Sequence, residues 1–154
     1  MQDKLEVLYQ VAKELNKNNI SWAIGASVLL YLKGIVLEFN DLDIVLEVKD
    51  VEKTKTIFKD LNATLYPSKD NSGYKTTCFL EYNLNGVDID LMAGFKIELD
   101  GVVHDCSFKA SDVKEYAKIK DVDIPLDDLN NWERYYLLMK RLNKVALIQN
   151  YFHK

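Results

Sequence analysis

The chain has 154 residues, of which 48% are hydrophobic and 29% are charged, and its formal net charge is −4. This composition is typical of a folded globular protein, and the length suits one domain with its own core but not two. General binding to a nucleic-acid backbone needs a basic face, so the negative net charge argues against it and no such binding is expected. A local basic cluster is compatible with this charge. We expect a single domain over residues 1–154, with a core over about 1–110 and a helical C-terminal segment over about 111–154.

Hydrophobic runs are short throughout the sequence. One of the longest, Ala26 to Leu32, ends at Lys33 and cannot cross a bilayer, so no membrane partner is expected. The charged N-terminus lacks the apolar core of a secretory signal, which predicts a cytoplasmic protein. The two cysteines, Cys78 and Cys106, lie in strand-like segments and are expected to be reduced core thiols.

The first part of the chain alternates helical and strand patterns. In chain order the expected elements are a helix over 2–17, a strand over 20–24, a helix over 26–33, a strand over 41–48, a helix over 51–61 and a strand over 63–66. Gly25 permits a tight turn between the first strand and the second helix, and Gly34 closes that helix. Asp50 is expected to cap the third helix.

The second part of the chain predicts two hairpins and then helices. The expected elements are a polar loop over 68–73, a hairpin of strands 74–83 and 87–92, a hairpin of strands 95–99 and 102–108, and helical segments from 111 to about 151 broken at 121–125. The dipeptides Asn85-Gly86 and Asp100-Gly101 favour two-residue hairpin turns. Asp127 or Asp128 is expected to cap the helix that begins near Leu129. The order predicts an α+β (mixed α/β) fold with one mixed sheet and helices packed against it.

Two acidic pairs are the chemically informative feature. Strand alternation places Asp41 and Asp43 on one face of their strand, and Asp88 and Asp90 on one face of a later strand. If the two strands are neighbours, these carboxylates converge and repel one another unless cations bind between them. Mg²⁺ suits such a site because it takes hard oxygen ligands and keeps positions for substrate phosphates.

Each feature also occurs without any function. Small residues at a strand-to-helix turn, as at Gly25 to Ser27, usually serve packing. A pair such as Asp41 and Asp43 is common at the exposed start of a strand. The prediction therefore depends on the order of turn, short helix, Asp-x-Asp strand and second acidic strand. In the second pair we favour Asp90 as the ligand, and Asp88 remains an alternative.

The segments "WAIGASVLLYLKG", "NDLDIV" and "VDIDLMAGF" resemble the minimal nucleotidyltransferase fold that is also seen in DNA polymerase beta. They are more closely similar to small bacterial nucleotidyltransferase-like proteins related to antibiotic nucleotidyltransferases and to the toxin half of abortive-infection systems. The resemblance extends from about Trp22 to Met92, and more loosely over the C-terminal helices. It implies a nucleotidyltransferase fold.

The resemblance also implies roles for particular residues. Asp41, Asp43 and Asp90 correspond to the catalytic carboxylates that hold two Mg²⁺ ions. Gly25 to Ser27 correspond to the turn that meets the triphosphate, and a turn leading into a helix presents backbone N–H groups to an anion. The implied reaction transfers a nucleoside monophosphate from a nucleoside triphosphate (NTP) to a hydroxyl group, with release of pyrophosphate.

One position departs from the pattern of the family, in which the glycine is followed by glycine or serine. Here Gly25 is followed by Ala26, and Ser27 comes one place later. Either Ala26 replaces the second small residue and the backbone still serves, or Ser27 supplies its hydroxyl from a shifted register.

Basic residues near the C-terminus form a second candidate group. Arg134 and Arg141 are seven residues apart on one predicted helix, which places them on nearly the same side, with Lys144 close to that face. Guanidinium groups suit phosphate oxygens, so these three residues are candidates for nucleotide binding. A solvated helix face, with Glu133 as an ion-pair partner, explains the same pattern equally well.

The predicted function is Mg²⁺-dependent nucleotidyl transfer from an NTP to an acceptor that the sequence does not identify: a small molecule, a protein or RNA. Because the chain has little room for a separate acceptor domain, a homo-oligomer or an antitoxin-like partner is expected to contribute. The alternatives are a non-catalytic nucleotide- or metal-binding regulator of the same fold, and a structural module whose acidic edge keeps a sheet soluble.

Overall fold

The computed structural model describes residues 1–67 and 76–154. The polar loop expected at 68–73 and the first residues of the strand expected from residue 74 lie outside the described residues. The helical elements are α1 (Gln2–Lys17), α2 (Ala26–Leu32), η1 (Val48–Asp50), α3 (Val51–Asp60), η2 (Ala110–Asp112), α4 (Leu129–Leu138) and α5 (Leu142–Phe152). The strands are β1 (Trp22–Gly25), β2 (Leu42–Leu46), β3 (Thr64–Leu65), β4 (Cys78–Leu84), β5 (Val87–Ala93), β6 (Lys96–Leu99), β7 (Val102–Asp105), β8 (Glu115–Ile119) and β9 (Val122–Leu126).

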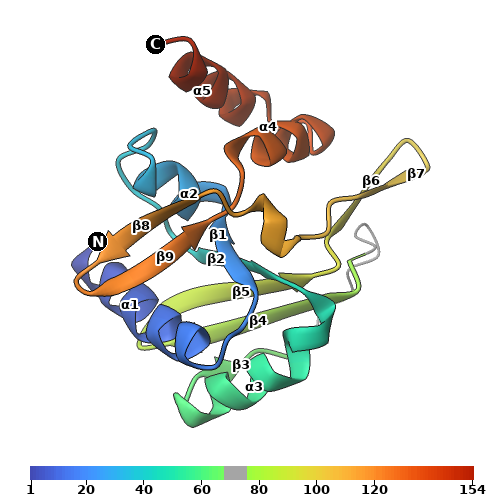
Figure 1. The fold of residues 1–154 in the computed structure, drawn as a ribbon. Helices are drawn as coiled ribbons and strands as arrows, with labels where there is room; N and C mark the ends of the chain where they lie inside the picture. The colour runs from blue at the N-terminus through green and yellow to red at the C-terminus, as the bar shows by residue number, and fades with distance from the viewer. Residues whose placement is uncertain (68–75) are drawn as a thin grey trace.

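One mixed sheet organises the molecule, as the sequence predicts. Its strands lie in the order β3-β4-β5-β2-β1-β9-β8, and β6 and β7 form a separate two-stranded ribbon. The pairs β1–β9 and β2–β5 are parallel, whereas β1–β2 is antiparallel. Helix α1 packs against β9, β5 and α3, while α4 and α5 lie together away from α1 and α3, beyond the sheet (Figure 1). The α+β prediction is confirmed.

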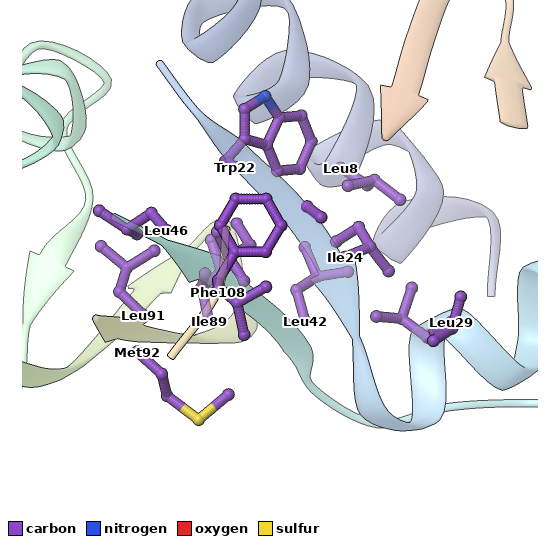
Figure 2. Close-up of a cluster of buried hydrophobic side chains, with 14 of the residues drawn as sticks. Leu8, Trp22, Ile24, Leu29, Leu42, Leu46, Ile89, Leu91, Met92 and Phe108 are labelled. Atoms are coloured by element: carbon purple, nitrogen blue, oxygen red, sulfur yellow. The ribbon is translucent and has the colours of Figure 1, made fainter. Parts of the chain in front are cut away.

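The core lies between α1 and the central strands. Helix α1 buries one apolar stripe, which includes Leu8 and Leu15, as its periodicity predicts. Leu8, Ile24, Leu42 and other buried side chains from the neighbouring strands gather in one cluster (Figure 2). Because side chains alternate along a strand, filling this face with apolar residues leaves the other face of β2 and β5 for polar ones.

The two predicted hairpin turns are present. Asn85 and Gly86 have φ angles of 51° and 84°, and Asp100 and Gly101 have φ angles of 52° and 80°. Both residues of each turn therefore adopt the left-handed conformation of a two-residue type I′ connection. Each turn fixes the register of its hairpin.

The expectation of a helical segment from residue 111 is wrong over its first part. Residues 115–119 and 122–126 are strands β8 and β9, and β9 pairs with β1 through Leu126 and Ile24. The sequence pattern does not predict β9, because a proline such as Pro125 is unusual inside a strand. Apart from the short 3-10 helix η2, helical structure in this segment therefore begins with α4 at Leu129, shortly after strand β9 of the main sheet.

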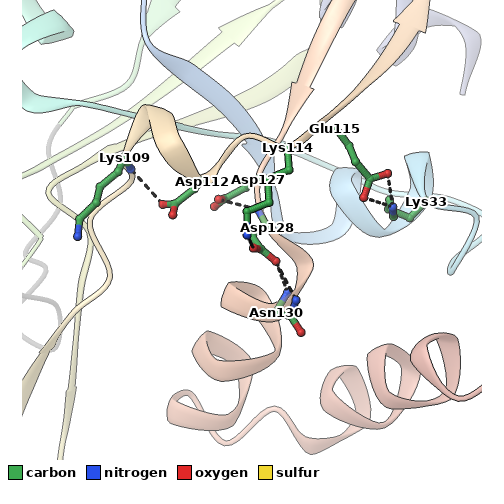
Figure 3. Close-up of polar contacts among 8 residues, drawn as sticks. All are labelled: Lys33, Lys109, Asp112, Lys114, Glu115, Asp127, Asp128 and Asn130. Atoms are coloured by element: carbon green, nitrogen blue, oxygen red, sulfur yellow. Dashed lines mark hydrogen bonds and ion pairs between the residues drawn. The ribbon is translucent and has the colours of Figure 1, made fainter.

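The predicted helix caps have different outcomes. Asp128 caps α4, because its carboxylate accepts a hydrogen bond from the Asn130 backbone N–H at 2.9 Å (Figure 3). Asp50 precedes α3, but its carboxylate instead accepts from the Ser21 backbone N–H at 3.1 Å. Asp50 therefore ties the start of α3 to the segment before β1.

Other expectations concern the cysteines and membranes. Cys78 is half-buried and Cys106 is buried, and both are free thiols. Within the described residues, no helix is both long enough and apolar enough to traverse a bilayer.

Candidate active site

A row of aligned residues crosses the middle of the sheet. Antiparallel pairing sets Gly25 of β1 opposite Asp43 of β2, and parallel pairing sets Asp43 beside Asp90 of β5. Antiparallel pairing continues the row from Asp90 to Glu81 of β4. Aligned residues of neighbouring strands project to the same face, so the acidic side chains of the row converge away from the apolar core.

The two central carboxyl groups are close enough to hydrogen-bond to each other. Burial and the charges of Asp90 and Asp41 raise the pKa of Asp43 well above its ordinary value. Burial and the charges of Asp41 and Glu81 raise the pKa of Asp90 to about 6. Burial and the charge of Asp88 also raise the pKa of Asp41. All three groups therefore resist carrying negative charge together, which is the electrostatic signature of a site that a cation would relieve.

The donor set fits Mg²⁺. Three carboxylates supply hard oxygen ligands, and they lie on rigid neighbouring strands or directly beside them. Among the described residues, no three Asp, Glu, His or Cys side chains are already close enough together to hold an ion. Asp41, Asp43 and Asp90 would therefore have to move closer together when an ion binds. Binding would also release any proton that Asp43 or Asp90 holds.

The acidic row opens into a cavity of about 600 Å³, within the usual range for small-molecule sites. Seven of the residues singled out from the sequence line it: Ala26, Ser27, Asp41, Asp43, Asp90, Arg141 and Lys144. Its apolar wall is formed by large side chains from several elements: Phe39, Phe79, Met92, Phe95 and Met139. The cavity thus combines an acidic floor, two cationic side chains and an apolar wall.

Asp88 does not share this position. Its carboxylate is exposed and accepts hydrogen bonds from the Tyr66 hydroxyl and the Asn83 side-chain amide, each at 2.9 Å. Asp88 does not line the cavity, whereas Asp90 does. This geometry favours Asp90 as the third carboxylate.

The turn between β1 and α2 differs from its predicted form. Gly25 is extended, with φ −129° and ψ −172°, and the left-handed residue is Ala26, with φ 52°. Gly25 is needed for another reason: a Cβ atom there would lie 2.7 Å from Cε2 and 2.8 Å from Nε1 of Trp132. The glycine therefore allows close packing of α4, and the alanine carries the backbone strain.

Ala26 provides a testable measure of this strain. Replacing Ala26 with Gly should stabilise the protein by about 0.5–1 kcal/mol, because the left-handed conformation is unfavourable for a residue with a Cβ atom. Urea unfolding of both proteins measures the difference. Ala12→Gly in the middle of α1 is the control and should destabilise the protein. A loss of stability in Ala26→Gly would contradict the assigned conformation.

The cationic residues do not lie on one helix as predicted. Helix α4 ends at Leu138, and Lys140 has a φ of 59°, so Arg141 lies in the break before α5. Arg141 and Lys144 line the cavity, whereas Arg134 does not. The Cζ atom of Arg134 lies 5.1 Å from the centroid of the Tyr135 ring. Helical periodicity does not predict this break, which changes the direction of the chain between Arg134 and Arg141.

Sequence reasoning missed the contacts that hold α4 as a wall of the site. Asp127 joins α4 to the sheet: its backbone N–H donates to the Ile24 carbonyl at 3.0 Å, and its carboxylate accepts from Trp132 Nε1 at 2.9 Å. The same carboxylate accepts from the Asp128 N–H, which draws the start of α4 toward β9 (Figure 3). Trp132 and Tyr136, which follow on α4, consequently line the cavity. Trp132 lies between Asn131 and Glu133, and nothing in this local sequence indicates its contacts with Asp127 and Gly25.

Comparisons with known proteins place the fold. No protein-family model and no curated protein sequence matches the chain. A solved structure from Thermotoga maritima, classed as a nucleotidyltransferase, superposes with a TM-score of 0.76 at 18% identity and covers 99% of this chain and 94% of its own. ANT(2″)-Ia in complex with adenylyl-2″-tobramycin superposes with a TM-score of 0.66 at 11% identity, and it covers 97% of this chain and 90% of its own.

A further similar structure is the lincosamide antibiotic adenylyltransferase LnuA bound to lincomycin. It has a TM-score of 0.58 and 13% identity, and covers 92% of this chain and 94% of its own. At these identities the likeness concerns the fold alone. The chain has the nucleotidyltransferase fold over nearly its whole length, as the resemblance of its motifs predicts.

Proposed function

We propose that this protein is a Mg²⁺-dependent nucleotidyltransferase that binds an NTP and transfers its nucleoside monophosphate to a hydroxyl acceptor. The observation that carries the proposal is the alignment of Asp43 and Asp90 on adjacent parallel strands, facing a cavity that Asp41 also lines. When bound, Mg²⁺ would neutralise the phosphates and these carboxylates together and promote attack at the α-phosphate.

The residues of the chain divide this task among them. Asp41, Asp43 and Asp90 would hold the metal. Ala26, Ser27, Arg141 and Lys144 line the same cavity. The backbone N–H groups of the first two and the cationic side chains of the last two would bind phosphate oxygens. The apolar wall with Phe39 and Phe79 offers aromatic surface for a nucleobase or an apolar part of the acceptor.

The choice of Asp90 over Asp88 can be tested by calorimetry. We expect the wild-type protein to bind at least one of MgATP, MgGTP, MgCTP and MgUTP. Asp90→Asn should weaken that binding at least about tenfold, because it removes a charged metal ligand. Asp88→Asn is the matched control on the same strand and should bind nearly as well as wild type. The reverse order would contradict the assignment, and no heat with any nucleotide would favour a structural module.

Variants of the two arginines distinguish a local contact with phosphate from a general effect of surface charge. Arg141→Ala should weaken MgNTP binding about 10-fold, the usual scale for one charge-assisted hydrogen bond to phosphate. Arg134→Ala removes an equal charge seven residues away, outside the cavity, and should leave that affinity unchanged. Titrations of both variants at equal ionic strength test the difference. Equal losses would show a long-range charge effect instead of a local contact.

A non-catalytic regulator that binds Mg²⁺ and nucleotide remains the second candidate, favoured by the alanine at position 26. Pyrophosphate release in the presence of candidate acceptors distinguishes the two, because both would bind MgNTP but only an enzyme turns it over. The acceptor class and any homo-oligomer or antitoxin-like partner are part of this proposal. The similar structures with bound antibiotic make small hydroxyl-bearing molecules the first acceptors to test.

A further inference from the structure

The cavity wall contains a buried polar atom that lacks a protein partner, the hydroxyl oxygen of Tyr136. Across residues 1–67 and 76–154, it is the one buried side-chain nitrogen or oxygen without a hydrogen bond. Tyr136 as a whole is only 1% exposed, and it lines the cavity. Buried hydroxyl groups are normally paired because an unpaired one costs free energy, so this atom calls for an explanation.

The Tyr136 ring is held by contacts with two neighbours in the wall of the cavity. The Trp132 ring packs against it with 5.5 Å between centroids, and Arg141 Cζ lies 5.4 Å from its centroid. Trp132 is itself held by the Asp127 carboxylate and packed against Gly25. The phenol is therefore fixed in orientation, as expected for a group that is organised before a ligand arrives.

The surroundings of the hydroxyl indicate which ligand it suits. Asp43, Arg141 and Ser27 lie near the hydroxyl. Burial raises the pKa of Tyr136, and Ser27 approaches closely enough to lower it in part as a hydrogen-bonding neighbour. Even so, no side chain or backbone group among residues 1–67 and 76–154 reaches full hydrogen-bond geometry with it. A phenol ordinarily keeps its proton at neutral pH, so the Tyr136 hydroxyl can donate a hydrogen bond. The hydroxyl thus lies among the turn, the acidic row and the guanidinium, where the proposed function puts phosphate oxygens.

We infer that the Tyr136 hydroxyl donates a hydrogen bond to a phosphate oxygen of the bound NTP. The inference rests on the proposed function and adds a phosphate-binding side chain that the sequence did not indicate. An anionic oxygen would satisfy the unpaired donor with a charge-assisted hydrogen bond. Because the ring is already held by Trp132 and Arg141, little additional ordering accompanies this contact.

The test removes the hydroxyl and keeps the ring. Tyr136→Phe should bind MgNTP and magnesium pyrophosphate at least about tenfold more weakly than wild type, the scale of a lost hydrogen bond to a charged group. Affinity for the corresponding nucleoside, which has no phosphate, should not change. Without ligand, the variant should unfold at the same urea concentration as wild type or a higher one, because no protein hydrogen bond is lost. Tyr135→Phe, on the same helix but outside the cavity, is the matched control and should bind as wild type does.

The outcomes separate this inference from the proposed function. If wild type and Tyr136→Phe bind MgNTP equally well, the hydroxyl does not contact phosphate, while the proposed function stands. If Tyr136→Phe loses stability without ligand and loses affinity for the nucleoside as well, the hydroxyl is structural and the inference is wrong. If the wild-type protein binds no MgNTP and no magnesium pyrophosphate, both proposals fail.

Discussion

Asp43→Asn is expected to make the metal-free protein more stable and the protein inactive. At pH 7.5 in EDTA, the variant should gain about 1–2 kcal/mol in free energy of unfolding, because the like charges of Asp43 and Asp90 no longer compete. The asparagine amide can also donate a hydrogen bond to the Asp90 carboxylate, which lies close to Asp43. In the same variant, Mg²⁺-dependent NTP binding and any turnover should be lost. Urea unfolding and calorimetry measure the two effects.

The pH dependence of this difference provides its control. The pKa of Asp43 is raised in the folded protein above its unfolded value of about 3.9. The wild-type protein therefore loses stability as the pH rises from about 4 toward the folded pKa, since the unfolded chain releases the proton more readily. Asparagine does not titrate, so the advantage of the variant should shrink toward zero near pH 4. A variant less stable than wild type at pH 7.5 would contradict the electrostatic account of the acidic row.

Gly25→Ala is expected to have the largest effect on stability. The added methyl group would collide with the Trp132 indole, whose Cε2 would be only 2.7 Å away. Because the backbone of Gly25 is extended, any residue can adopt its conformation, and the loss comes from the collision alone. We expect a cost of about 2–3 kcal/mol, typical of overpacking a rigid core site. The displaced α4 should also weaken MgNTP binding.

A double-mutant cycle tests the cause of this loss. In a Trp132→Leu background the methyl group gains room, so Gly25→Ala should cost at least about 1 kcal/mol less than in wild type. Urea unfolding of the four proteins gives the coupling energy. An equal cost in both backgrounds would place the strain elsewhere than at the contact between β1 and α4.

Local patterns predicted the strands of the acidic row better than they predicted the surroundings of the site. The two-residue alternation that buries Leu42 and Ile44 also fixes where Asp43 projects, and the same holds for Asp90 between Ile89 and Leu91. That β2 and β5 are parallel neighbours does not follow from alternation, because more than 40 residues separate their paired positions in the sequence. For that adjacency, the resemblance of the motifs to a known fold was the better guide.

The missed features all depend on contacts between distant segments. Because of Pro125, the sequence pattern predicts a break where the structure has strand β9. Without β9, the pattern does not indicate that the start of α4 lies beside β1. A continuous helix through residues 134–144 predicts Arg134 in the site, and the break at Lys140 is the reason that it lies outside. Tyr136 carries no local signal at all, since its role depends on how α4 packs over Gly25.

Binding of Mn²⁺, a spectroscopic substitute for Mg²⁺, tests the central claim most directly. Electron paramagnetic resonance should detect Mn²⁺ bound by the wild-type protein in the presence of the tightest-binding NTP, with up to two ions per chain. The Asp43→Asn variant, titrated under the same conditions, should leave the ion free or bound by the nucleotide alone. Equal Mn²⁺ binding by the two proteins would contradict the claim that the acidic row is a metal site.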